Sequence, residues 1–235
     1  MAALYPVFVR ALITRGRLLA MGALGFVAIL LAILVRTSAD LDRHNVAYNL
    51  VDSYGLSILV PVVALVFASA ALGDPSEDGT LVYLWLRPVP RWQLATAAVL
   101  AALTVSVPLA VLPIVLGALI SGTGARLVLG ALFGSLLMAA AYSAVFCGLG
   151  LRVRRALAWG LGYLLIWEQA VARIAKGAAR LSISVTSRTV DARIAQHDPL
   201  PRNAMSMAVA VGVPVALAVA AVVFTTRSLD RGEIT

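Results

Sequence analysis

Residues 74–93 read DPSEDGTLVYLWLRPVPRWQ, a polar and partly aromatic stretch between two long apolar runs. The chain around it has 235 residues, of which 61% are hydrophobic and 13% are charged. One soluble core of this size could not cover so many apolar side chains, so the composition indicates a membrane protein. The stretch then reads as a loop at one membrane surface, and the flanking runs read as helices that cross the bilayer.

Six runs approach or exceed the roughly 20 apolar residues that a membrane-spanning helix needs. Their continuous apolar character favours helices over barrel strands, which would alternate between lipid-facing and lumen-facing residues. The runs cover residues 18–35, 54–73, 94–121, 127–151, 156–171 and 205–225. We therefore predict an all-α membrane protein with a six-span transmembrane domain over residues 18–235, and with both termini on the same side.

The N-terminal residues 1–17 are predicted to form an amphipathic helix lying on the membrane surface. Arg10, Thr14 and Arg17 fall on one helical stripe, and apolar residues surround the other side. A cleaved signal peptide is the alternative interpretation. The apolar run 18–35 is too long for the core of such a peptide, which disfavours cleavage.

The distribution of arginines predicts the orientation. With the N-terminus inside, the inner segments hold ten arginines and the first two outer loops hold three. The positive-inside rule then places both termini and residues 74–93 in the cytoplasm. The outer segment 172–204 opposes this rule, because it carries six basic residues. We expect that segment to form a pair of short re-entrant helices at the outer surface.

The first half of the 74–93 loop carries helix-start and turn signals. Asp74 followed by Pro75, with Glu77 three residues on, is typical of a capped helix start. Gly79 then permits a turn. The loop should therefore open with a short helical turn that ends at Gly79.

The second half of the loop predicts a short helix parallel to the membrane. Thr80 can cap a helix over residues 81–86, and Pro88 ends it. Arg91 and Trp92 would anchor the return into the bilayer at headgroup level. An apolar patch on this helix would consist of Leu81, Leu84 and Trp85.

The segment SEDGTLVYLWLRPVPRWQL resembles the coupling segment of ABC-2 type permeases, the membrane subunits of ATP-binding-cassette exporters. In that family the short helix sits in a groove of the ATP-hydrolysing subunit and transmits its closure to the membrane helices. One departure is that the acidic residues are spread out instead of forming a tight run before Gly79. The resemblance implies coupling roles for Glu77, Gly79, Thr80, Leu81, Leu84, Trp85, Pro88 and Arg91.

The six-span layout is also similar to that of type V ABC exporters, and residues 166–184 further resemble a Trp-Glu to Leu-Ser stretch near the outer helix pair of bacterial members. The resemblance implies two permease subunits, identical or related, above two ATPase subunits that bind ATP and Mg. The chain itself has no phosphate-loop motif, and its sole lysine is Lys176. We therefore expect no enzymatic activity and no cofactor in this chain.

Glu168 is the ionisable residue that stands out within the predicted spans. A charge at the bilayer centre costs about 2.5–3.5 kcal/mol on insertion scales, so Glu168 should face protein, water or a basic partner. Its role is either to orient the outer helix pair or to act in gating. Small residues such as Gly130 and Gly134 permit close helix packing, within one subunit or between subunits.

Other functions fit the sequence less well. Both histidines, His44 and His197, lie in predicted outer loops, and Cys147 is the one cysteine, which disfavours a membrane hydrolase. The predicted bilayer interior is nearly free of charge, which disfavours an ion-driven carrier. The basic residues flank apolar runs, so we expect contact with lipid headgroups and not with nucleic acid. The sequence therefore favours a bacterial inner-membrane exporter of hydrophobic or amphiphilic substrates, with an ion-driven carrier or a membrane scaffold as alternatives.

Overall fold

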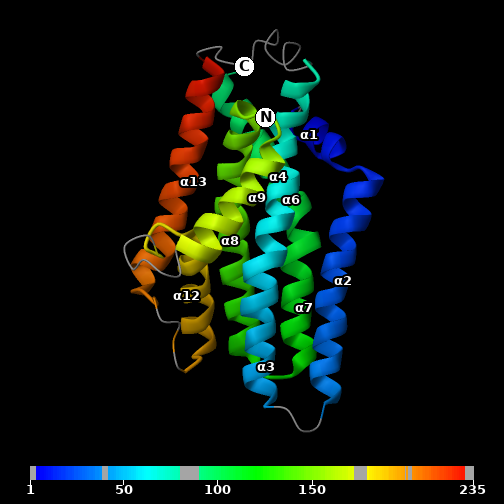
Figure 1. The fold of residues 1–235 in the computed structure, drawn as a ribbon, viewed down its shortest axis with the longest axis vertical. Coiled ribbons are helices and arrows are strands. Elements are labelled where there is room, and N and C mark those ends of the chain that lie inside the picture. The colour runs from blue at the N-terminus through cyan, green and yellow to red at the C-terminus, as the bar shows by residue number, and fades with distance from the viewer. Residues whose placement is uncertain are drawn as a thin grey trace.

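The computed structural model describes residues 4–38, 42–79, 90–171, 179–198, 200 and 203–230, with the backbone alone described at 169–171. All its regular elements in these residues are helices, and the long ones run side by side along one axis (Figure 1). We call the end of the bundle that carries residues 74–79 the Asp74 end, and the opposite end, near Asp42, the Asp42 end. The start of the described chain and the end of its last helix both lie at the Asp74 end (Figure 1).

The bundle is built from ten α-helical and three π-helical segments within the described residues. Several of them follow one another without a break and form single long helices. In chain order they are α1 (Tyr5–Leu12), α2 (Arg15–Thr37), α3 (Arg43–Asn49), η1 (Leu50–Leu59), α4 (Val60–Glu77), α6 (Arg91–Ser106), η2 (Val107–Val111), α7 (Leu112–Ser121), α8 (Ala125–Arg152), α9 (Ala156–Tyr163), η3 (Leu164–Val171), α12 (Ile183–Ala195) and α13 (Met207–Asp230).

Five helices in the described residues are long and apolar enough to cross a membrane. They are Arg15–Thr37, Arg43–Glu77, Arg91–Ser121, Ala125–Arg152 and Met207–Asp230. Four of them contain a whole predicted span, and the last one begins two residues after the start of the span 205–225. The remaining predicted span, 156–171, begins as the shorter apolar helix Ala156–Glu168. A full sixth crossing therefore stays a prediction.

Helix α8 is the central element, since it contacts α4, α6, α7, α12 and α13. Small residues permit this close packing. A Cβ atom on Gly150 would lie 2.2 Å from the backbone oxygen of Ser69 in α4, and one on Gly134 would lie 3.1 Å from the backbone oxygen of Ser187 in α12. Gly130 and Gly134 thus pack within this one chain, as one of the two readings predicted.

The N-terminal helix α1 uses its apolar stripe for packing against the bundle. Leu4, Phe8 and Leu12 recur every four residues, and each is at most 3% exposed. They pack in the core, and α1 contacts α6 and α4. Arg10, on the other side of the helix, is exposed. Helix α1 is therefore amphipathic as predicted, but its apolar stripe packs against the helices of the bundle.

The expected helix start at Asp74 is wrong. Helix α4 runs from Val60 through Pro75 without interruption and ends at Glu77. Proline removes one backbone donor, but the surrounding burial of α4 as far as Gly73 keeps the helix intact. The turn at Gly79 does occur, with a φ of 68° in the left-handed region that glycine tolerates best.

Candidate functional site

Two of the three acidic residues that precede the predicted coupling helix form hydrogen bonds with other parts of the bundle. The guanidinium of Arg17, at the start of α2, donates to both carboxylate oxygens of Asp74, at 2.8 and 3.2 Å. The Oε1 atom of Glu77 accepts a hydrogen bond of 3.0 Å from the backbone N–H of Arg155. The end of α4 is therefore connected to α2 on one side and to the α8–α9 turn on the other.

The structure describes three of the predicted coupling residues. Glu77 is the last residue of α4, Gly79 lies in the turn after it, and Arg91 is the first residue of α6. These positions bring the two sides of the loop to the Asp74 end. The other predicted coupling residues lie outside the described residues: Thr80, Leu81, Leu84, Trp85 and Pro88.

Glu168 lies inside the bundle, 3% exposed, with its carboxylate at the start of α12. It accepts hydrogen bonds from the backbone N–H groups of Ile183 and Ser184, at 3.2 and 3.3 Å, and from the hydroxyl of Ser182. The Tyr163 hydroxyl donates a further bond of 3.1 Å. A carboxylate at a helix N-terminus satisfies unpaired donors and faces the positive end of the helix dipole.

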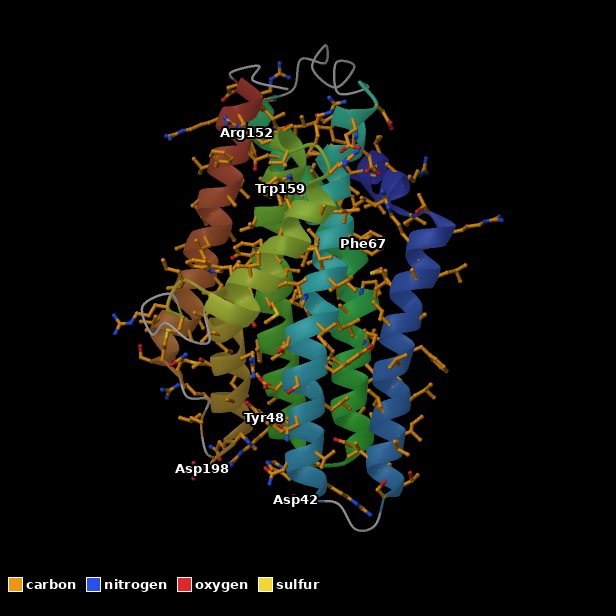
Figure 2. The ribbon with its side chains drawn as sticks, in the orientation of Figure 1. Asp42, Tyr48, Phe67, Arg152, Trp159 and Asp198 are labelled. Carbon is orange, nitrogen blue, oxygen red and sulfur yellow. The ribbon has the colours of Figure 1, made fainter. Side chains whose placement is uncertain are left out.

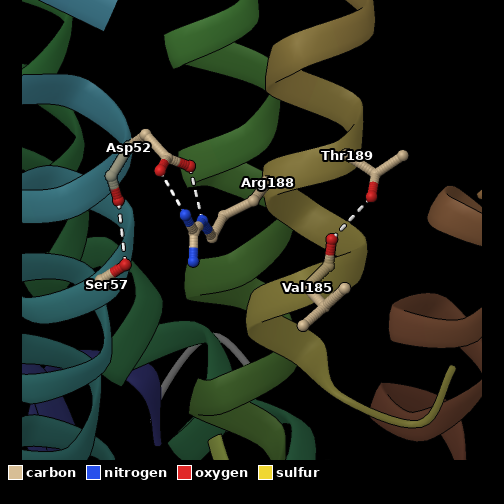
Figure 3. A network of polar contacts seen from close by, with 5 residues as sticks. All are labelled: Asp52, Ser57, Val185, Arg188 and Thr189. Carbon is tan, nitrogen blue, oxygen red and sulfur yellow. Dashed lines mark hydrogen bonds and ion pairs between the residues drawn. The ribbon is translucent and has the colours of Figure 1, made fainter. Parts of the chain in front are cut away.

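A buried ion pair joins η1 to α12 (Figure 3). The guanidinium of Arg188 donates from Nε and Nη2 to the two carboxylate oxygens of Asp52. The side chain of Asp52 is 7% exposed and that of Arg188 is 21% exposed. In the π-helical stretch the Ser57 hydroxyl donates to the backbone oxygen of Asp52 at 3.0 Å.

A second carboxylate lies one helical turn after Arg188. Asp191 is fully buried, and neither of its carboxylate oxygens has a hydrogen-bond partner among the described residues. Its side chain lies close to α8, since a Cβ atom on Gly130 would approach Asp191 Oδ1 to 2.6 Å. A buried carboxylate without a partner favours the protonated, neutral form.

These buried charged residues lie outside the predicted spans, so a bilayer interior nearly free of charge stays a prediction. Asp52 lies two residues before the predicted span, and Arg188 and Asp191 lie in the segment assigned to the outer surface. The spacing of Arg188 and Asp191 was the sequence feature that could have indicated a shared polar face, because residues three apart lie on one side of a helix. A bidentate pair is close to neutral as a unit, which makes such burial tolerable.

The two histidines meet at the Asp42 end. The ring of His197 stacks on Tyr48 with 3.7 Å between centroids, and His44 lies 6.2 Å from His197. Figure 2 shows Tyr48 near this end of the bundle. Partial burial and the nearby His44 lower the pKa of His197. Among the described residues no group of three His, Cys, Asp or Glu side chains could hold a metal ion.

Comparison with known families decides the class of protein. The family described as ABC-2 family transporter protein matches residues 14–160, which is more than half of the chain. The chain belongs to this family. As a member of the ABC-2 transporter family it is a multi-pass integral membrane protein, and family members work with a separate ATP-binding subunit. A search among curated proteins finds no match to the chain.

The family match covers α2 to α8 and the predicted coupling segment 74–93. It ends before Glu168 and α12, so Glu168 and Arg188 lie in the part of the ABC-2 chain that the family match does not reach, whereas Asp52, the partner of Arg188, lies within the match. The resemblance read from the coupling segment is thereby confirmed at the level of the family.

Replacing Glu168 with Gln should loosen the start of α12. The amide keeps one oxygen acceptor but turns the second into a donor, which cannot pair with the N–H of Ile183 or Ser184. We expect a loss of about 1–3 kcal/mol of stability, measured by thermal unfolding in detergent. Transport that falls only in proportion to folded protein supports an orienting role, whereas transport lost at full stability supports gating.

Proposed function

We propose that this chain is the permease subunit of an ATP-driven exporter in a bacterial inner membrane. The observation that carries the proposal is the ABC-2 family match over residues 14–160, which includes the segment between α4 and α6. The cargo would be hydrophobic or amphiphilic. Both termini would be cytoplasmic, because the arginine-rich segments, such as Arg152 to Arg155, lie at the Asp74 end.

The assembly we propose contains two permease subunits, identical or related, and two ATPase subunits that hold ATP and Mg. One chain supplies one coupling segment, so a pair of ATPase subunits requires a pair of permeases. The base of the contact between permease and ATPase would consist of Glu77, Gly79 and Arg91. The apolar side chains of residues 81–85 would enter a groove of the ATPase.

The contacts at the end of α4 support a mechanical route from that segment into the membrane. A push on residues 80–86 would reach α2 through the Asp74–Arg17 pair. It would reach the α8–α9 turn through the hydrogen bond between Glu77 and the backbone of Arg155. Closure of the ATPase subunits would then rock two parts of the bundle and open an outward path.

A charge at Leu84 tests this route. We expect Leu84→Glu to abolish substrate-stimulated ATP hydrolysis in the reconstituted complex, because a carboxylate cannot be buried in an apolar groove without a partner. Leu84→Met, which keeps an apolar side chain of similar volume, is the matched control. Full stimulation in the Leu84→Glu complex, or purification of an active assembly without an ATPase subunit, would overturn the proposal.

An ion-driven carrier is the second candidate. The buried carboxylate of Asp191 favours it, since carriers often place such groups inside the membrane domain. Transport by vesicles that hold an ion gradient and lack ATP would support the carrier. Transport that requires ATP and survives Asp191→Asn would support the exporter.

A further inference from the structure

An apolar groove of about 910 Å³ lies between α8, α9 and α13. Its walls include Leu149 of α8, Trp159 of α9, and Leu217 and Phe224 of α13. From Leu217 to Phe224 is two helical turns, or about 10 Å along the bundle axis. The groove is thus an elongated apolar strip, as large as the cavities that hold small ligands.

The groove ends in positive charge at the Asp74 end. Arg152 lines it there, and Figure 2 shows Arg152 nearer to that end than Trp159. The Nε atom of Arg152 donates to the Ser228 hydroxyl at 3.3 Å, and its guanidinium carbon lies 5.1 Å from the centre of the Phe224 ring. The guanidinium is therefore held at the mouth of the groove by two contacts with α13.

The charge around this mouth is unbalanced. Residues 150–156 read GLRVRRA and residues 224–230 read FTTRSLD, which together contain four arginines and one aspartate. Glu77 also reaches this turn, through the backbone of Arg155. Among the described residues of these two stretches, with Glu77 added, four arginines face two acids. With the Asp74 end at a membrane surface, this excess would lie near the phosphate headgroups.

The apolar part of the groove opens away from the bundle. Trp159 is 67% exposed and Phe224 is 50% exposed, although both are large and apolar. Exposed tryptophan is typical of the membrane interface, where its ring meets acyl chains and headgroups. Helix α13 is also the least covered of the long apolar helices, with 11% of its apolar window buried.

We propose that this groove is a binding site for an anionic phospholipid from the leaflet at the Asp74 end. An acyl chain would lie along Leu149, Leu217 and Phe224, and the phosphate would meet the arginines at the mouth. Charge complementarity selects the headgroup, since a zwitterionic lipid of the same chain length would gain no net attraction there. The site is independent of the direction and the energy source of transport.

Tryptophan quenching by brominated lipids tests the site in the full-length protein. Trp85, Trp92 and Trp167 are replaced by Phe, so that Trp159 is the only fluorophore, and the protein is placed in phosphatidylcholine nanodiscs. A small fraction of lipid with brominated chains is added as phosphatidylglycerol or as phosphatidylcholine. We expect the anionic lipid to quench Trp159 with about fivefold higher apparent affinity.

Two variants locate the binding determinants. Arg152→Gln should reduce the preference for the anionic headgroup, whereas Arg152→Lys should retain most of it because the charge remains. Ala221→Phe, which fills the groove, should weaken quenching by both lipids. A protein with Trp92 as its sole tryptophan, at the start of α6, reports the bulk lipid and should show less preference.

Three results would overturn the proposal. Equal quenching of Trp159 by the two headgroups would show a lipid-facing surface without selectivity. Absence of quenching by either lipid would show that protein, such as a second permease subunit, covers the groove. A preference that survives both Arg152→Gln and Ala221→Phe would place the anionic lipid elsewhere.

Discussion

Arg188→Gln is expected to lower the free energy of unfolding by about 3–5 kcal/mol. The substitution removes the guanidinium that pairs with Asp52 and leaves that carboxylate, 5% exposed as a residue, without its partner. It also removes a positive charge that lies one helical turn before the buried Asp191. Since Arg188 and Asp52 belong to α12 and η1, the contact between these two elements should loosen first.

Thermal unfolding in detergent, followed by loss of the monodisperse peak in size-exclusion chromatography, measures this effect. Arg180→Gln is the matched control, because Arg180 is an exposed arginine just before the same helix. The double variant Asp52→Asn, Arg188→Gln should recover much of the lost stability, since no unpaired charge then remains at this pair. A double variant as unstable as Arg188→Gln would contradict this account.

Gly150→Val should have the second largest effect, because it acts at the close contact between α8 and α4. A Cβ atom at Gly150 would lie 2.2 Å from the backbone oxygen of Ser69 and 2.9 Å from its carbonyl carbon. Backbone atoms cannot rotate away as a side chain can, so the two helices must separate. Overpacking of this kind costs about 1–3 kcal/mol or more.

The control for this prediction is Gly162→Val in α9, where no atom lies within 4 Å of an added Cβ atom. Both substitutions change a helical glycine to valine, so their effects on helix propensity are alike. We expect Gly150→Val to lower the melting temperature and the yield of folded protein, and Gly162→Val to change neither. Similar losses from both would mean that the α4–α8 contact is not the cause.

The long helices were predictable from sequence because the property that defines them is local. A run of apolar residues long enough to cross a bilayer can be counted without knowledge of its neighbours. Four of the five long helices contain a whole predicted run and the last contains nearly all of one, and α4, for example, extends the run 54–73 to Glu77. The turn at Gly79 is also local, since it follows from the backbone freedom of one residue.

The polar contacts were not predictable in the same way. Asp74 has a sequence pattern typical of a helix start, yet its carboxylate binds Arg17, which lies 57 residues earlier in the chain. Asp52 and Arg188 are 136 residues apart. Taken alone, Asp52 reads as a residue just before an apolar run, and Arg188 reads as one of the basic residues of the outer segment 172–204. Their pairing depends on which helices become neighbours in the bundle.

Sequence by itself thus determined that this chain is helical, lies in a membrane, and resembles ABC-2 type permeases in the segment after its second apolar run. The tertiary structure decided where its charges go: Glu168 to the start of α12, and Arg188 to Asp52. The length of an apolar run and the residues of a turn are properties of one continuous segment, so they can be read from the sequence of that segment alone. An ion needs a partner of opposite charge or a set of free N–H donors, and inside this bundle those come from separate helices.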